Sequence, residues 1–173
     1  MIVDAQGAQD RIRVATALLQ AAADHGVTLA IAESLTGGQV SSSLVEVPGA
    51  SRVLVGTVVA YATRIKAQLL GVDAAHLERT GPVDRDVALQ MADGVRRLLG
   101  ADVGLATTGV AGPGPADGHP AGTVHVAVVA PWGQRHRELH LCGDRSQIRC
   151  ATVMDVCELA IGFLQKDECG PQP

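Results

Sequence analysis

Three features of the sequence predict an α/β fold in which helices cover both faces of a mixed β-sheet. Short and almost wholly apolar runs, such as residues 28–32 and 102–107, indicate strands that helices bury on both sides. Segments between such runs place apolar residues at helical spacing, as residues 10–25 do. A turn-like break at residues 131–133 joins two β-like runs, which indicates a hairpin. The expected architecture is a single-domain, three-layer α/β/α sandwich.

The order of the elements follows from apolar spacing and from residues that begin or end helices. Gly26 and Gly71 each follow a helical segment, and glycine readily adopts the left-handed conformation of a helix C-terminus. Asp84 precedes apolar residues at helical spacing and is predicted to cap that helix. The predicted helices cover residues 10–25, 39–46, 63–70, the run from Asp84 to Leu98, and 146–165. The predicted strands cover residues 28–32, 53–61, 102–107, 123–130 and 135–141.

The chain is long enough for one domain, expected to span residues 10–165. It has 173 residues, of which 47% are hydrophobic and 18% charged. Residues 1–9 and 166–173 are predicted to be flexible tails. No internal repeat or linker interrupts the pattern.

Charge and composition argue against nucleic acid and membranes as partners. With 14 Lys and Arg against 18 Asp and Glu the net charge is −4, and Trp, Tyr and Phe occur once each, so a basic footprint and a stacking platform are both absent. The longest apolar stretches, such as residues 53–62, are well short of the ~20 residues that span a bilayer. Residues 1–9 lack the basic and apolar segments of a signal peptide. We expect a cytoplasmic protein.

The metal-binding side chains do not form a site in the sequence. The cysteines lack a C-x-x-C pair, and two of them fall on the apolar stripe of the last helix, where a thiol acts as a small hydrophobe. His136 and His140 are four residues apart, roughly 13 Å in a strand, too far to chelate one ion without another strand. We expect a reduced protein without a metal or other cofactor. The four cysteines are Cys142, Cys150, Cys157 and Cys169.

Two glycine-rich segments, residues 32–38 and 107–114, each follow a predicted buried strand. Ligands of open α/β sheets bind beyond the carboxyl ends of strands, where glycine lets backbone N–H groups approach an anion. A helix beginning near Gly37 would add its N-terminal dipole. Neither segment has the spacing of a Walker A or dinucleotide motif, so plain structural turns are an equally good interpretation. The candidate ligand-binding residues are Thr36, Gly37, Gly38, Thr108, Gly109, Gly112 and Gly114.

Ser34 lies at a strand-to-helix turn, a position that suits a nucleophile. The alternative is that Ser34 or Thr36 simply caps the next helix. A serine needs a base, and no histidine lies in either glycine-rich turn. Lys66 could serve if a cleft desolvates it, with the phenol of Tyr61 as a relay. The alternatives are a solvated helix lysine and a half-buried sheet tyrosine.

Arg145 precedes the last predicted helix and follows Asp144. An arginine there could bind an anionic ligand with two parallel hydrogen bonds. A plain surface role is an equally good interpretation.

The chain contains an ordered set of motifs: Ala32-Glu-Ser-Leu-Thr-Gly-Gly38, Val58-Val-Ala-Tyr61 with Lys66, Leu70-Gly-Val72, Arg96-Arg-Leu-Leu-Gly-Ala-Asp102, Thr108-Gly-Val-Ala-Gly-Pro-Gly114 and Gly143-Asp144-Arg145. In this order the motifs closely resemble the CinA C-terminal domain family, which includes bacterial nicotinamide mononucleotide (NMN) amidohydrolases. The resemblance extends from about Ala15 to Leu164.

This resemblance implies hydrolysis of the NMN carboxamide to nicotinate mononucleotide and ammonia, as in pyridine nucleotide salvage. By motif position Ser34 matches the nucleophile, Lys66 the base and Tyr61 its assisting hydroxyl. The oxyanion is expected near Gly37, and the phosphate near the loop 109–114, Thr108 or Arg145. We expect a stand-alone form, without the nucleotide-binding N-terminal domain of longer members, that forms a dimer or larger homo-oligomer.

The sequence departs from the family pattern at Leu35, where the family often has Cys, at Ala62-Thr63 and at Pro82-Val83-Asp84. These changes bear on substrate positioning and turnover rather than on the type of reaction. Two other functions stay open. One is a non-catalytic nucleotide-binding or interaction domain linked to competence or DNA repair, and the other is an amidohydrolase of a different carboxamide.

Overall fold

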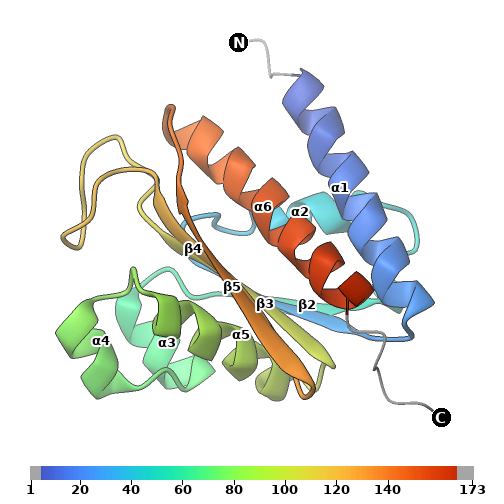
Figure 1. The fold of residues 1–173 in the computed structure, drawn as a ribbon, viewed down its shortest axis with the longest axis horizontal. Helices are drawn as coiled ribbons and strands as arrows, with labels where there is room; N and C mark the ends of the chain where they lie inside the picture. The colour runs from blue at the N-terminus through green and yellow to red at the C-terminus, as the bar shows by residue number, and fades with distance from the viewer. Residues whose placement is uncertain (1–4, 167–173) are drawn as a thin grey trace.

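The computed structural model describes residues 5–166, which form a five-stranded sheet between two layers of helices (Figure 1). The helices are α1 (Ala5–Asp24), α2 (Gln39–Val45), α3 (Thr63–Leu70), α4 (Ala74–Thr80), α5 (Arg85–Leu99) and α6 (Arg145–Lys166), with a 3₁₀ turn, η1, at Ala50–Arg52. The strands are β1 (Leu29–Glu33), β2 (Leu54–Val59), β3 (Val103–Gly109), β4 (Thr123–Ala130) and β5 (Gly133–His140). The predicted α/β/α sandwich around a mixed sheet is confirmed.

The strand order β2-β1-β3-β4-β5 brings the carboxyl ends of three strands to one edge of the sheet. β1 is parallel to β2 and β3, whereas β4 and β5 are antiparallel and form the predicted hairpin. After β1 the chain crosses to the face of α2, and after β2 it crosses to the face of α3. Such a change of side opens a crevice at the carboxyl ends of the strands, where α/β proteins bind ligands.

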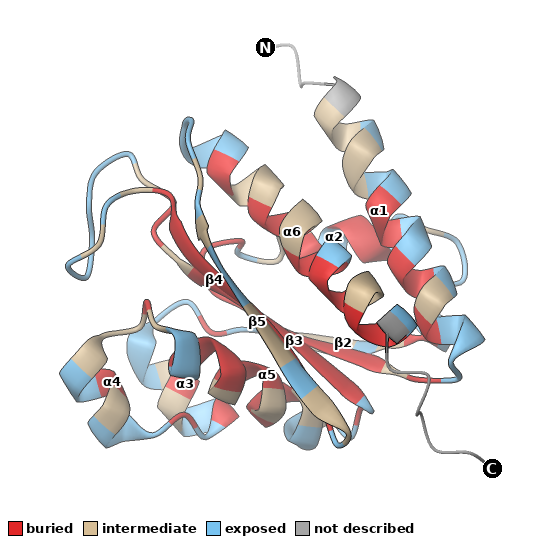
Figure 2. Ribbon diagram, viewed as in Figure 1, coloured by how far each residue is buried: buried red, intermediate tan, exposed pale blue. Residues whose placement is uncertain are grey.

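Alternation along β1 gives the two faces of the sheet different cores. Leu29 and Ile31 pack with α1, α2 and α6, while Ala30 and Ala32 pack with α3, α4 and α5. All five residues of β1 are buried, as Figure 2 shows for the centre of the sheet. The apolar run therefore indicated a central strand correctly, because helices cover both of its sides.

Most predicted elements are confirmed to within two residues, but two expectations change. Residues 5–9 were expected in a flexible tail, yet they form the start of α1. The sequence interpretation assigned no element to α4, whose start is capped by Asp73 through the N–H groups of Ala75 and His76. α2 begins at Gln39, as predicted for the helix over residues 39–46, so the other start considered, near Gly37, is not formed. Asp84 caps α5 as predicted, through the N–H groups of two residues, Asp86 and Val87.

The remaining segments of residues 167–173 and 1–4, expected as tails, lie outside the described residues. Within residues 5–166, none of the helices has the length and apolar character needed to cross a bilayer.

Cys157 is buried in the core, as predicted, and burial raises the pKa of its thiol to about 12. Cys150 is half-buried beside Arg11, and Cys169 lies outside the described residues.

Close packing between helices α3 and α5 depends on a glycine. A Cβ built on Gly94, in the middle of α5, would lie 1.9 Å from the carbonyl oxygen of Leu70. Leu70 ends α3, the helix that carries Lys66. The absence of a side chain at Gly94 therefore sets how closely the end of α3 approaches α5.

Gly94→Ala should lower the free energy of unfolding by about 1–3 kcal/mol or more, because the new methyl group overlaps backbone atoms that cannot move separately. The matched control is Gly162→Ala in α6, where nothing lies within 4 Å of the new Cβ. That control should gain about 0.4–1 kcal/mol from the better helix former. Urea unfolding of both variants measures the difference, and equal effects would show that the α3–α5 contact is not tight.

Candidate active site

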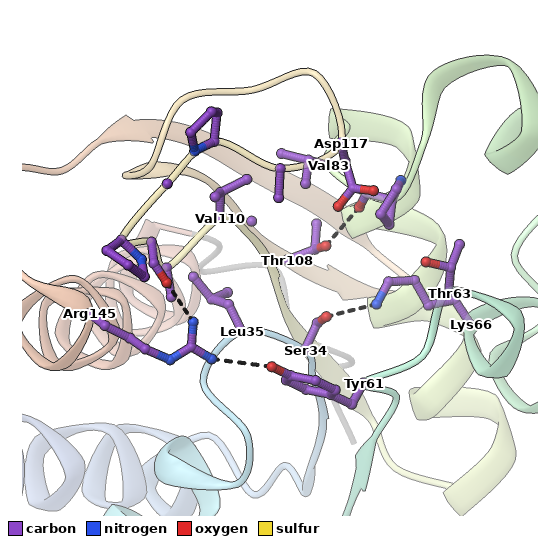
Figure 3. Close-up of a pocket in the computed structure, with 18 residues that line it drawn as sticks. Ser34, Leu35, Tyr61, Thr63, Lys66, Val83, Thr108, Val110, Asp117 and Arg145 are labelled. Carbon is purple, nitrogen blue, oxygen red and sulfur yellow. Dashed lines mark hydrogen bonds between the residues drawn. The ribbon is translucent and has the colours of Figure 1, made fainter.

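A pocket of about 390 Å³ opens at the carboxyl ends of β1, β2 and β3 (Figure 3). Its walls come from the turn after β1, the segment after β2 with helix α3, the residues before α5, the loop after β3 and the first residue of α6. The lining includes Ser34, Leu35, Tyr61, Thr63, Lys66, Pro82, Val83, residues 108–117 and Arg145. The crevice expected from the strand order is therefore present, and it contains most of the residues selected from the sequence.

Ser34 is held at the floor of this pocket by a turn that is fixed on both sides. Its own N–H donates to the carbonyl of Thr107 on β3 at 3.0 Å. The guanidinium of Arg149, on α6, donates to the carbonyls of Leu35 and Thr36. Ser34 is 9% exposed, so its hydroxyl reaches the pocket while its backbone stays inside the fold.

The start of α2 is capped by Glu33, the last residue of β1, and not by Ser34 or Thr36. The buried carboxylate of Glu33 accepts the N–H groups of Gly38, Val40 and Ser41, and also the hydroxyl of Ser41. The cap alternative for Ser34 is therefore wrong. Sequence reasoning gave Glu33 no role, although an acid between an apolar strand and a helix start was a visible signal.

Thr36, Gly37 and Gly38 do not line the pocket, in contrast to the prediction that they bind substrate. Thr36 is fully buried, and its hydroxyl bonds to that of Thr107. The N–H of Gly37 donates to the carbonyl of Ser34, and the N–H of Gly38 donates to Glu33. Because these donors are occupied, the expected oxyanion and anion sites at this helix start are corrected.

Lys66 and Ser34 form the central pair of the pocket. The amine Nζ of Lys66 donates to Ser34 Oγ at 2.8 Å and to the carbonyl of Ala60 at 2.8 Å. Lys66 is 1% exposed, so the alternative of a solvated helix lysine is wrong. A lysine amine at hydrogen-bond distance from a serine hydroxyl is the arrangement of a nucleophile with its base.

Burial lowers the pKa of Lys66 from 10.5 to about 8, although the carboxylate of Asp117 opposes this shift. The physical cause is that a charged ammonium loses its hydration when it is enclosed. With such a pKa, about one amine in ten is neutral at pH 7. The neutral form can accept a proton from Ser34, so this lysine can act as a general base near neutral pH.

Tyr61 lies in the pocket, but its hydroxyl has a different partner from the one predicted. It accepts a hydrogen bond from Arg145 Nη2 at 3.2 Å, and among the described residues neither Ser34 nor Lys66 bonds to it. The other guanidinium branch, Nη1, donates to the carbonyl of Gly112 at 2.8 Å. Tyr61 is 63% exposed rather than half-buried. In this arrangement the phenol positions Arg145, and the predicted relay is not formed.

The loop after β3 forms the opposite wall of the pocket. Thr108, Gly109, Gly112 and Gly114 all line it, as selected from the sequence. The hydroxyl of Thr108 donates to the carbonyl of Pro82. Arg145 completes the wall, and two of the five N–H groups of its guanidinium are bonded to Gly112 and Tyr61.

Two histidines outside the pocket, His136 and His76, contact residues that their spacing in the sequence did not predict. His136 contacts His125 of β4, with ring nitrogens 2.9 Å apart, and burial lowers the pKa of both. His76, Asp84 and Asp86 lie near one another at the start of α5. Asp84 Oδ1 already caps α5 and contacts His76 at 2.7 Å, so this cluster has a structural role.

Comparison with known proteins identifies the family of this chain. The family model of the CinA C-terminal domain matches residues 11–164. The chain belongs to this family. A competence-damage inducible protein of Desulforamulus reducens is 46% identical over 158 residues, which cover 91% of this chain and 38% of that protein. A CinA-like protein of Synechococcus sp. is 50% identical over 150 residues, 84% of this chain and 36% of the relative.

The CinA-domain chain therefore spans little more than a third of these curated relatives. Solved CinA structures match it more completely. The competence/damage inducible protein CihA from Agrobacterium tumefaciens superposes with a TM-score of 0.86 at 35% identity, covering 91% of this chain and 96% of the other. A CinA superfamily protein from Escherichia coli gives a TM-score of 0.83 at 30% identity, with coverages of 95% and 94%.

Replacing the buried amine should change how stability depends on pH. Lys66 has a pKa of about 8 in the fold against 10.5 when unperturbed, so the unfolded chain binds the proton more tightly. Stability of the wild type should therefore rise with pH between these two values. Lys66→Met removes this slope. The free energy of unfolding of the variant, compared with that of the wild type, should therefore be most favourable below pH 8. It should fall by up to about 3 kcal/mol relative to the wild type as the pH rises to 10.5.

Urea unfolding at several pH values between 7 and 10 measures this difference. Arg64→Met, which removes an exposed charge from the same helix, is the control and should leave the slope of the wild type unchanged. Parallel pH curves for the wild type and Lys66→Met would show that the amine has an ordinary pKa.

Proposed function

We propose that this CinA-domain protein hydrolyses the carboxamide of NMN to nicotinate mononucleotide and ammonia. The observation that carries the reaction type is the 2.8 Å contact between a buried lysine amine and Ser34 Oγ inside an open pocket. The choice of NMN rests on the resemblance of the pocket motifs to NMN amidohydrolases. Arg145 at the rim adds a cation that suits the phosphate.

In the first step the neutral amine of Lys66 takes the proton of Ser34 as Oγ attacks the carboxamide carbon. A C–O bond forms, and the carbonyl π pair moves to oxygen to give a tetrahedral oxyanion. The new ammonium of Lys66 then returns its proton to the departing nitrogen, the C–N bond breaks, and ammonia leaves. The result is a nicotinoyl ester of Ser34.

The second half-reaction repeats these roles with water. Lys66, neutral again, accepts a proton from a water molecule that attacks the ester, and Ser34 leaves as its hydroxyl after taking that proton back. The same pair therefore serves acylation and deacylation. The pyridinium ring assists both steps, because its positive charge makes the carbonyl carbon more electrophilic.

The backbone N–H of Leu35 is the donor best suited to the oxyanion. It follows the nucleophile directly, Leu35 lines the pocket, and within the described part of the chain no acceptor takes this N–H. Arg149 holds the Leu35 carbonyl from the other side, which keeps the turn rigid. A fixed donor of this kind stabilises developing charge without reorganisation during the reaction.

The purified protein should release ammonia from NMN without added metal or nucleotide, and Ser34→Ala or Lys66→Met should each reduce kcat by orders of magnitude. The double variant should be little worse than either single one, because a nucleophile and its base act as a unit. An enzyme-coupled ammonia assay measures all four proteins. Ser42→Ala, at an exposed position of α2, is the matched control. Undiminished activity in Ser34→Ala would overturn the proposal.

The kcat/KM for NMN should rise with pH and level off above about pH 8, the pKa of Lys66. Only the unprotonated amine can accept the serine proton, so the rising limb reports its titration. Initial rates from pH 5 to 9 measure this profile. A flat profile, with chemistry shown to limit the rate, would require a permanently charged lysine that acts by electrostatic stabilisation instead.

A further inference from the structure

Asp117 is the one acidic side chain among the described residues that line the pocket. The cations of the lining are Lys66 and Arg145. Figure 3 shows Asp117 and Arg145 on opposite sides of the pocket, with Ser34 between them. The reacting position is therefore flanked by one negative and one positive group.

The carboxylate of Asp117 has no hydrogen bond or ion pair with any described residue, although it faces an amine-containing pocket. Its backbone is well fixed. The N–H and carbonyl groups of Ala116 and His119 bond to each other, which closes a tight turn over Asp117 and Gly118. The Asp117 carboxylate therefore stands on a fixed backbone, is exposed and is free to meet a ligand.

The turn itself does not require a negative charge. Asp117 has φ +51° and Gly118 has φ +79°, the left-handed pair of a tight hairpin turn. Asparagine adopts this conformation at least as readily as aspartate. The turn therefore explains why a residue of the Asp or Asn type stands at position 117, but it does not explain why that residue is negatively charged.

We propose that Asp117 is a specificity-determining residue that favours ligands with a positive charge next to the reacting carboxamide. The inference rests on the proposed function, because it names a preference at the same pocket. The preferred class is N-substituted pyridinium carboxamides that also carry an anionic group for Arg145. Carboxamides with a neutral ring are disfavoured relative to them.

Asp117 also acts on the base. The amine is bonded to the Ser34 hydroxyl and the Ala60 carbonyl, and the other titratable or charged side chains that line the same pocket are Tyr61, Arg145 and Asp117. Arg64 lies beside it on α3 and points to solvent. Asp117 is the negative member of this set, and its charge raises the pKa of Lys66 against the effect of burial. Removing the charge should lower that pKa further.

Asp117→Asn tests the charge alone, because asparagine keeps both the shape and the turn. Binding is measured by calorimetry in a Ser34→Ala background, so turnover does not interfere. The ligands are NMN and its 1,4-dihydro form, which has the same carboxamide and phosphate but a neutral ring. We expect the Kd of NMN to rise about tenfold and that of the dihydro form to change less than about twofold. Asp86→Asn, an exposed acid on α5, is the control for net charge.

A second readout needs no ligand. The sequence contains two lysines, Lys66 and Lys166, so the ¹³Cε signals of labelled lysine are readily assigned. The pKa of Lys66 should fall below about 8 in Asp117→Asn while that of Lys166 stays unchanged. Local unfolding would instead move the Lys66 pKa up toward 10.5.

The outcomes separate this inference from the proposed function. Equal loss of affinity for both ligands, no loss for either, or no binding of NMN would overturn the role of Asp117. A wild type that prefers the cationic ligand through Asp117, yet releases no ammonia from NMN, would overturn the proposed reaction and leave the charge preference standing.

Discussion

The buried carboxylate of Glu33 determines where the candidate site can form. A fully enclosed acid costs considerable free energy unless its oxygens are hydrogen-bonded, and four donors at the start of α2 meet that requirement. The carboxylate thereby ties the end of β1 to the start of α2 and fixes the turn between them, on which Ser34 lies. It also neutralises the dipole of α2. The start of α2 therefore has no free donors for an anion, and the cations among the described residues that line the pocket are Lys66 and Arg145.

Lys66 shows the opposite balance, in which a group remains buried at a cost. Its amine has two hydrogen-bond partners and no contacting carboxylate, and burial depresses its pKa as a result. If position 66 had only a structural role, an apolar side chain there would give a more stable fold than a lysine. Groups that destabilise a fold while acquiring an unusual pKa are typical of active sites, because the same desolvation that costs stability makes an amine a base near neutral pH.

Contacts over long sequence separations assemble the pocket wall around this pair. Arg145 and Tyr61 are 84 residues apart, yet they bond across the rim, and Arg145 also holds the loop at Gly112. The departures from the family pattern fall in the same wall. Thr63, Pro82 and Val83 line the pocket, and Thr108 bonds to Pro82. These three positions shape the wall of the pocket, and none of them bonds to Ser34 or Lys66.

The sequence alone determined the features that depend on near neighbours. Apolar spacing and capping residues predicted the sandwich, most element positions, the Asp84 cap and the position of Ser34 after β1, because each arises within a few residues of chain. Tertiary structure alone decided what depends on packing between distant segments. The exposure of Lys66, the partner of the Tyr61 hydroxyl, the donors claimed by Glu33 and the pairing of His125 with His136 belong to this group. Local sequence left open whether Lys66 is buried or solvated, and it did not show that Glu33 accepts the N–H of Gly38. Burial and hydrogen bonding are set by whichever elements pack against a residue, and a reading of neighbouring residues does not contain that information.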